Sequence, residues 1–262
     1  MIKKFLITGD THGVNISAVK NARRMYKELK PEEIGLIILG DAGFNFGDHP
    51  IDLKWKKICN KVGVQVYCVR GNHDEHPRYM KTMEVKWDKE VQGNVFYEQE
   101  CPNLHYFIDG ETYSICGKRT LVVGGAYSID KEYRIKKGKF WEPHEQINRE
   151  EQLKILEACS HEIFDLVLTH TCPMSWQPTD LFLSFVDQTN VDNSMEYFLE
   201  ELEKSISWKV WLFAHYHEDR LIRPQVQMIY KHMTPLDHIF EGWENPNSNY
   251  HFGWQVDPNY NS

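Results

Sequence analysis

The chain has 262 residues, of which 41% are hydrophobic and 26% are charged, and its formal net charge is −8. This length is sufficient for one large α/β domain with a hydrophobic core, and no apolar run approaches the ~20 residues that a membrane-spanning helix needs. The acidic balance argues against a broad surface for duplex nucleic acid, whose backbone is bound by clustered Lys and Arg.

Five short apolar runs, each followed by polar or glycine-rich residues, are predicted to be buried strands. They occupy residues 5–8, 35–39, 64–69, 166–169 and 210–213. Amphipathic segments between them are predicted to be helices, at residues 16–29, 51–62, 150–159 and 193–206. The last helix is expected to begin with Asn193 or Ser194 as its N-cap.

The middle of the chain has a different pattern. Residues 104–108, 112–116 and 120–123 read as short strands, with Asp109-Gly110 as one hairpin turn and Gly117–Arg119 as a second. An antiparallel meander inserted into a strand–helix alternation predicts two packed sheets with helices outside, an αββα sandwich. We expect residues 1–240 to form this domain and residues 241–262, rich in Asn, Pro and aromatic residues, to form a tail packed on it.

Chemically active side chains follow each of the five core strands. The motifs are GDTHG (9–13), GDAG (40–43), RGNHDE (70–75), THTCP (169–173) and AHYHED (214–219). An isolated Asp after a strand is usually a turn cap, and an isolated His is usually a surface or packed residue. Because ligands of open α/β sheets bind at the carboxyl ends of the strands, five such ends together predict one functional site there.

The residue types in these motifs predict a metal site. The candidate ligands are Asp10, His12, Asp41, Asn72, His170, His215 and His217. The set is too large for one cation, and its mixed oxygen and nitrogen donors favour Mn, Fe, Zn, Ni or Co over Ca or Mg. Asp41 is the most plausible bridging carboxylate between two cations ~3.5–4 Å apart, a separation used for in-line displacement at phosphorus.

The same motifs, in this order between residues 9 and 217, resemble the calcineurin-like metallophosphoesterase superfamily. The first and third motifs resemble the serine/threonine protein phosphatases in particular. The middle motif, GDAGFNFG, lacks the Asp and Arg of that branch, and the pair His215 and His217 is closer to the phosphodiesterase-type branches. Ala214 takes the position of the usual glycine in the final motif.

The resemblance implies a two-sheet sandwich flanked by helices and a role for each motif residue. It implies Asp10, His12 and His217 at one metal, Asn72, His170 and His215 at the other, and Asp41 with a hydroxide bridging them. It also implies that His73 protonates the leaving oxygen, a transfer that typically contributes ~10²–10⁴-fold. Asp74, the next residue, is our candidate to orient the His73 ring.

Two arginines are candidate substrate-binding residues. Arg70 precedes the Asn-His pair, and its planar guanidinium suits a phosphate oxygen, although a salt bridge is the alternative. Arg134 lies in GGAYSIDKEYR (124–134), which we expect at the rim of the site. It belongs to a basic run at residues 131–139, interpreted either as a solvated loop or as a guide for single-stranded nucleic acid.

We therefore expect a metal-dependent phosphoric ester hydrolase that cleaves phosphate mono- or diesters by direct attack of a metal-bound hydroxide. A nuclease or phosphodiesterase acting on single-stranded nucleic acid or nucleotides stays open as an alternative, as does a non-catalytic scaffold on the same fold. The first apolar run is too short for a secretory signal core of ~7–15 residues. The six cysteines lack CxxC spacing, so reduced thiols and a cytoplasmic location are expected.

Overall fold

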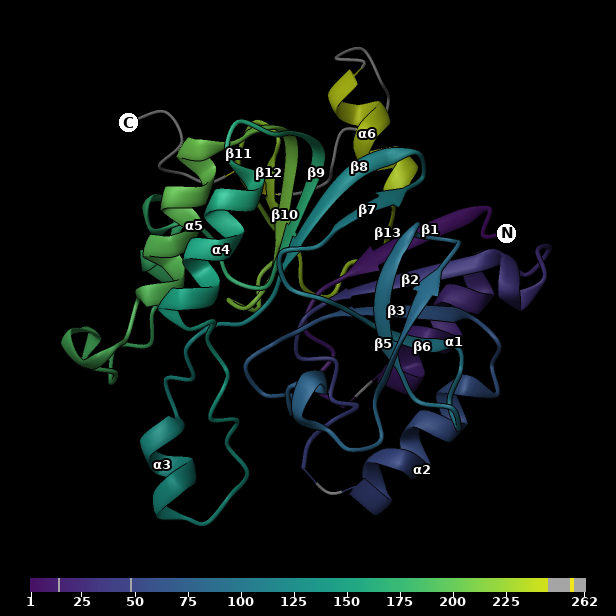
Figure 1. Ribbon diagram of the computed structural model, residues 1–262, viewed down its shortest axis with the longest axis horizontal. Helices are drawn as coiled ribbons and strands as arrows, with labels where there is room; N and C mark the ends of the chain where they lie inside the picture. Colours follow the sequence, from purple (N-terminus) through teal and green to yellow (C-terminus); the bar gives the residue numbers. More distant parts are fainter. Residues whose placement is uncertain (14, 48, 245–254, 257–262) are drawn as a thin grey trace.

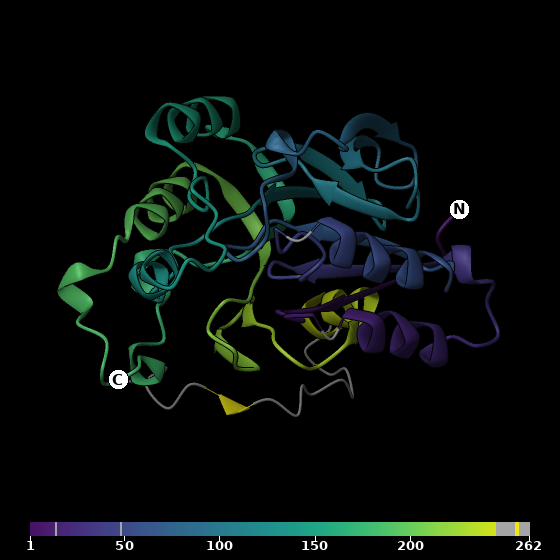
Figure 2. The same ribbon diagram turned by 90° about the horizontal axis from the view of Figure 1, so that it is seen from below.

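The strands of this protein form two seven-stranded sheets that lie between two layers of helices (Figure 1). The computed structural model describes residues 1–13, 15–47, 49–244 and 255–256. Seen from below, helices flank the strands on both sides (Figure 2). This arrangement confirms the predicted αββα sandwich.

The first sheet is built mainly from the N-terminal third of the chain. Its strands, in spatial order, are β13 (Thr234–Pro235), β1 (Lys4–Thr8), β2 (Ile34–Leu39), β3 (Gln65–Val69), β6 (Leu104–Phe107), β5 (Gly93–Tyr97) and β4 (Glu84–Asp88). Strands β1, β2, β3 and β6 are parallel, and β13, β5 and β4 add antiparallel edges. The carboxyl ends of β1, β2 and β3 therefore meet at one edge.

The second sheet contains the later strands. In spatial order they are β14 (Gln255–Val256), β11 (Arg220–Arg223), β12 (Val226–Met228), β10 (Ser207–Phe213), β9 (Ile163–Thr169), β8 (Lys118–Val123) and β7 (Thr112–Ile115). Strands β8, β9, β10 and β12 run parallel, and β7 pairs antiparallel with β8. The predicted turn at Gly117 thus joins a true hairpin.

Helices cover the outer faces, and three hydrophobic cores hold the layers together. The helices are α1 (Asn15–Met25), α2 (His49–Asn60), α3 (Lys131–Lys136), α4 (Arg149–Cys159), α5 (Ser194–Ser205) and α6 (Leu236–Glu244). One core joins the two sheets, a second packs α4 and α5 on the second sheet, and a third packs α1 and α2 on the first. Removing this apolar surface from water stabilises the layered arrangement.

Strand β2 illustrates why the core strands appear in the sequence as continuous apolar runs. All six of its residues are buried. Ile37 and Leu39 face the core between the sheets, while Leu36 and Ile38 face the helices. Since both faces of the strand are covered, alternation of polar and apolar residues is absent.

The predicted hairpin at Asp109-Gly110 is wrong. β6 pairs with β3 and β5 in the first sheet, whereas β7 belongs to the second sheet. The turn therefore carries the chain from one sheet to the other. Asp-Gly supplies the positive φ of a tight turn, and Gly110 has φ +81°, but that conformation does not determine which strands pair.

Three further features differ from expectation. Strands β4 and β5 had no counterpart in the predicted elements, and the basic run begins as helix α3, which stands apart from the other helices (Figure 1). Asn193 precedes α5, but its side chain makes no capping bond to the helix. Asp192 Oδ1 instead accepts a hydrogen bond from Ser194 N at 3.0 Å. A carboxylate therefore accepts from the first backbone N–H of the helix.

The expected C-terminal tail falls mostly outside the described residues, since 245–254 and 257–262 are not described. Residues 241–244, its first part, continue helix α6. Among the described residues, no helix combines the length and apolar character required to cross a bilayer. All six cysteines carry free thiols, and Cys116 is exposed while the other five are buried.

Candidate metal centre

The predicted ligands converge where the two sheets meet. Asp10, Asp41 and Asn72 follow β1, β2 and β3 of the first sheet, and His170 and His215 follow β9 and β10 of the second. The backbone N–H of His215 donates to Asp10 Oδ2 at 3.0 Å, which links the two sheets directly. Carboxyl ends of parallel strands from both sheets thus form a single site.

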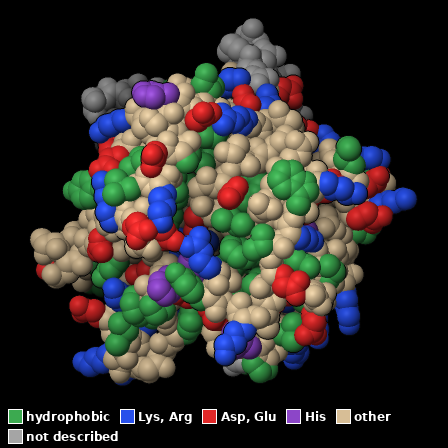
Figure 3. Space-filling view, in the orientation of Figure 1, with side chains coloured by type: hydrophobic (Ala, Val, Ile, Leu, Met, Phe, Trp, Pro, Cys, Tyr) green, Lys and Arg blue, Asp and Glu red, His purple; other side chains and the backbone are tan. Residues whose placement is uncertain are grey.

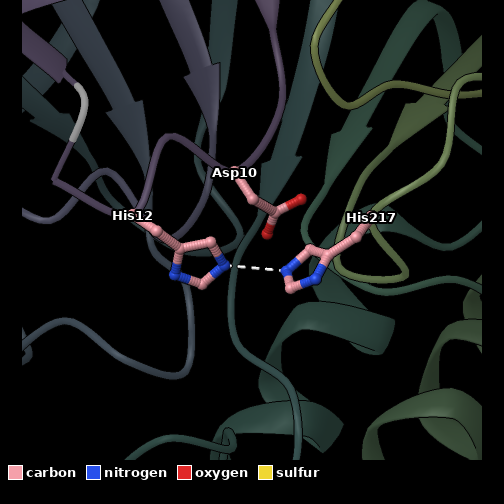
Figure 4. Close-up of side chains that lie close together, drawn as sticks. All are labelled: Asp10, His12 and His217. Carbon is pink, nitrogen blue, oxygen red and sulfur yellow. Dashed lines mark hydrogen bonds between the residues drawn. The ribbon is translucent and has the colours of Figure 1, made fainter. Parts of the chain in front are cut away.

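One group of donors comprises Asp10, His12 and His217, whose ligand atoms all lie within 4.8 Å of one another. The Nε2 atoms of His12 and His217 are 2.7 Å apart, and the Asp10 carboxylate points toward both rings (Figure 4). Two imidazole nitrogens and one carboxylate oxygen form a donor set that suits a divalent transition metal.

A second group comprises Asp10, Asp41 and His170, also with ligand atoms within 4.8 Å of one another. Asp41 Oδ1 lies 3.7 Å from His170 Nε2, and Asp41 Oδ2 lies 3.8 Å from His12 Nε2. Its two oxygens therefore face different groups of donors, as a bridging carboxylate requires. The ring of His215 lies beside this group, with its centroid 5.0 Å from that of His170.

Asn72 and His170 show most directly that this site suits a cation. His170 Nδ1 donates to the Leu39 carbonyl at 2.7 Å, so Nε2 carries no proton in the neutral ring. Asn72 Nδ2 donates to Ser128 Oγ at 2.9 Å, which turns Oδ1 toward His170 Nε2 at 2.9 Å. Two lone pairs thus face each other, an arrangement that a metal ion between or beside them would stabilise.

The backbone at the ligands is strained. Four of the seven predicted ligands have positive φ: His12 at 40°, Asp41 at 45°, His215 at 69° and His217 at 57°. This left-handed region is costly for residues with a Cβ, and such conformations concentrate at functional sites. Gly40, with φ +89°, lies so close that a Cβ would approach His170 Nδ1 to 2.0 Å.

Burial and mutual charge shift the pKa values of the carboxylates. Burial raises the pKa of Asp10 well above its usual value, and the nearby Asp41 carboxylate raises it further. Burial also opposes ionisation of Asp41, but His170, His73 and His12 lower its pKa to about 2. Asp10 Oδ1 is buried and has no hydrogen-bond partner among the described residues. A cation would satisfy that oxygen and favour its ionised form.

Three of the histidines, His170, His215 and His217, have lowered pKa values that favour the neutral ring. Burial lowers the pKa of His170 and lowers that of His215 well below its usual value. Burial and the neighbouring His12 lower the pKa of His217 to about 4. Metals bind the neutral imidazole, so these rings are already in the protonation state that metal binding requires. The donor set, its protonation and its unpartnered oxygen all fit divalent cations.

His73 lies at the centre, and Asp74 is bonded to the loop that carries Asp41. The His73 backbone N–H donates to Asp41 Oδ1 at 2.8 Å. The Asp74 carboxylate accepts from the backbone N–H groups of Ala42 and Gly43 at 2.9 and 3.0 Å. Asp74 therefore holds the loop that carries Asp41, and its role in orienting the His73 ring stays a prediction.

Arg70 makes structural contacts inside the protein, and its role in substrate binding stays a prediction. The side chain is buried, and its Nε donates to Asp109 at 2.8 Å. The two terminal nitrogens donate to the carbonyls of Gly124, His144 and Glu145 at 2.8–3.2 Å. With its donors directed at these acceptors, the guanidinium is turned into the protein and joins three loops.

Arg134 lies on α3 and pairs with Asp130 at 2.7 Å. Burial lowers the pKa of His73, Asp41 raises it, and the positive charge of Arg134 lowers it again. The arginine thus acts electrostatically on the centre, and its role in substrate binding stays a prediction. Ser128, which fixes Asn72, went unrecognised because nothing in the sequence around it marks a residue that supports a ligand.

Comparison with known proteins identifies the family. The family model for calcineurin-like phosphoesterase matches residues 3–219, and the chain belongs to that family. Among solved structures, a crystal structure of TT1561 of Thermus thermophilus is similar at 12% identity and a TM-score of 0.42, covering 88% of this chain and 89% of that chain. No curated protein gives a significant match.

Family membership implies metal-dependent hydrolysis of phosphoesters, and the Asp and His groups described above could bind the metal. The resemblance inferred from the strand-end motifs is confirmed.

Proposed function

We propose that this protein hydrolyses phosphate mono- or diesters with two divalent cations, by direct attack of water on phosphorus and without a covalent enzyme intermediate. The observation that carries the proposal is the pair of donor groups that share Asp10, with Asp41 facing both. Family membership supports the reaction class.

We assign the following roles to the residues of the site. Asp10, His12 and His217 would hold one cation, Asn72, His170 and His215 the other, and Asp41 would contact both. Bound cations would supply Lewis-acid activation of water and neutralise charge on the phosphoryl oxygens. The buried carboxylates and neutral imidazoles hold the donors in place before substrate arrives, which removes a reorganisation cost from the reaction.

His73 is proposed as the acid that protonates the leaving oxygen. It lines the same cavity as Asp41 and His217, and its ring centroid lies 5.7 Å from that of His12. A bound phosphate adds negative charge beside the ring, which favours the protonated imidazole that this role requires.

Metal analysis and a paired assay test the proposal. Protein stripped with chelator and reconstituted with Mn²⁺ is assayed on chromogenic phosphate monoesters and diesters. We expect turnover of at least one ester, and Asp41→Asn should lower kcat on the order of 10³-fold. Asp165→Asn, which removes a carboxylate paired with Lys209 at 2.7 Å on the partly exposed start of β9, is the matched control.

The alternatives predict different results. A non-catalytic scaffold would bind less than one equivalent of metal and turn over no ester with any of several cations. A nuclease guided by α3 would lose activity on single-stranded oligonucleotides, but not on small esters, when Lys136 and Lys137 are changed to Glu. Basic and acidic side chains are interspersed over the face shown in Figure 3, which favours small phosphoesters over a long polyanion on that face.

A further inference from the structure

A cavity of about 440 Å³ opens beside the metal centre. Asp41, Asn72, His73, His215 and His217 line one end of it. Its size lies within the range of small-molecule sites, ~300–1,000 Å³. A phosphoester whose phosphoryl group reaches the metal ligands must therefore place the rest of the molecule in or near this space.

Much of the remaining lining is apolar. It comes from side chains of the segment between residues 181 and 191 together with Ile129, while Gln177, Gln188 and Asn193 add amide groups. Phe182 stacks on Tyr216 with a centroid separation of 6.3 Å and an interplanar angle of 18°. Leu183 and Phe185 are 45% and 82% exposed. Large exposed apolar side chains beside a polar centre are typical of a ligand-binding wall.

The charges of the cavity restrict what it can hold. Asp130 and Glu196 line it, whereas no lysine or arginine is among the described residues that do so. Glu196 is buried, its Oε1 accepts from Thr171 at 2.7 Å, and its Oε2 has no partner among the described residues. Additional phosphate or carboxylate groups on the substrate would meet no lysine or arginine among these described lining residues, and the Asp130 carboxylate would repel them.

We propose that this cavity binds the leaving group of the substrate, and that this group is an uncharged or cationic alcohol with an apolar ring. The inference rests on the proposed phosphoesterase function and adds the substrate class. The wall formed by Phe182, Leu183 and Phe185 would cover the ring while the phosphoryl group lies at the metal ligands. Nucleoside polyphosphates fit the cavity poorly because their leaving groups are anionic and no lysine or arginine is among the described lining residues.

Two esters that differ in apolar area test the proposal. Phenyl phosphate and 1-naphthyl phosphate have leaving groups of similar acidity, so the reacting centre is matched. With Mn²⁺-loaded protein, kcat/KM should be about tenfold higher for the naphthyl ester. Leu183→Ser should remove most of that preference, because it should lower kcat/KM more for the naphthyl ester than for the phenyl ester. Leu153→Ser is the matched control, because Leu153 lies on α4, outside the cavity lining, and is 51% exposed.

The possible outcomes separate the two proposals. Absence of turnover of both esters across several metals would overturn the phosphoesterase proposal. Turnover of both with equal kcat/KM, or equal effects of Leu183→Ser and Leu153→Ser, would overturn the leaving-group cavity and leave the phosphoesterase intact. Loss of the naphthyl preference in Leu183→Ser alone supports the cavity.

Discussion

Arg70 and Ser128 show how the surroundings of a residue decide its role. Arg70 lies two residues before the predicted ligand Asn72, yet its guanidinium is directed toward backbone carbonyls and Asp109. Ser128 is fifty-six positions from Asn72 in sequence and accepts its amide N–H. Sequence proximity to Asn72 therefore did not reveal which residue contacts it, because backbone direction after a strand decides where each side chain points.

Arg70→Lys is expected to lower the free energy of unfolding by about 2–4 kcal/mol, because one ammonium group cannot serve a carboxylate and three separate carbonyls. Urea denaturation measures the change. Arg119→Lys, at an exposed arginine that pairs with Glu162 at 2.6 Å, is the control and should change the stability little. Unchanged stability together with a raised KM would restore Arg70 as a substrate-binding residue.

Ser128→Ala should weaken Mn²⁺ binding by about 10–100-fold, because the amide of Asn72 loses the acceptor that fixes its orientation. Titration of chelator-treated protein against a metal-sensitive dye measures the affinity. Ser175→Ala removes an exposed hydroxyl that bonds to Glu200 at 2.8 Å, and it should leave the affinity unchanged. Equal affinities of the two variants would show that Ser128 does not support the site.

At the scale of elements, α5 carries an unusual residue on its buried face. Met195, Phe198 and Leu199 pack into the core on the outer face of the second sheet, and the carboxylic acid Glu196 is buried in the same turn. Burial raises the pKa of Glu196 to about 7, and the hydrogen bond from Thr171 opposes this only in part. The helix thus holds a proton that the unfolded chain would release at neutral pH.

This proton makes the stability depend on pH. The folded-state pKa of Glu196, about 7, lies above the ordinary value of 4.5, so its contribution to stability is full at low pH and is lost as the pH rises from about 4.5 to about 7. Glu196→Gln should remove this dependence and raise stability at pH 8 by on the order of 3 kcal/mol. Urea denaturation at pH 5 and pH 8 tests it, with the exposed Glu157→Gln as control. A pH slope shared by all three proteins would contradict the prediction.

At the scale of the whole molecule, the candidate metal centre lies where the two sheets meet. Asp10, Asp41 and Asn72 come from the first sheet, and His170 and His215 come from the second. The core between the sheets is apolar, so the centre supplies the polar connection at one edge. A ligand that binds only the folded state shifts the unfolding equilibrium toward that state. Here a bound cation would do so by linking both sheets of the sandwich.

Removal of metal should therefore lower the thermal stability of the entire domain. Mn²⁺ at 100 times its Kd should stabilise chelator-treated protein by about 2.7 kcal/mol, seen as a rise in Tm. Asp41→Asn should reduce this rise, and Asp165→Asn should show the full effect. If Mn²⁺ leaves the Tm of the wild-type protein unchanged, the proposed centre does not bind the cation in the folded state.

The sequence alone determined the core strands, the layered α/β class and the family, because apolar runs and strand-end motifs are local patterns. It also identified the donors that meet at the centre, since the carboxyl ends of parallel strands must share an edge. Only the tertiary structure decided that residues 104–123 cross between sheets, that Arg70 faces inward and that Ser128 supports Asn72. These depend on contacts between distant segments, which burial and hydrogen bonding select after the local elements have formed.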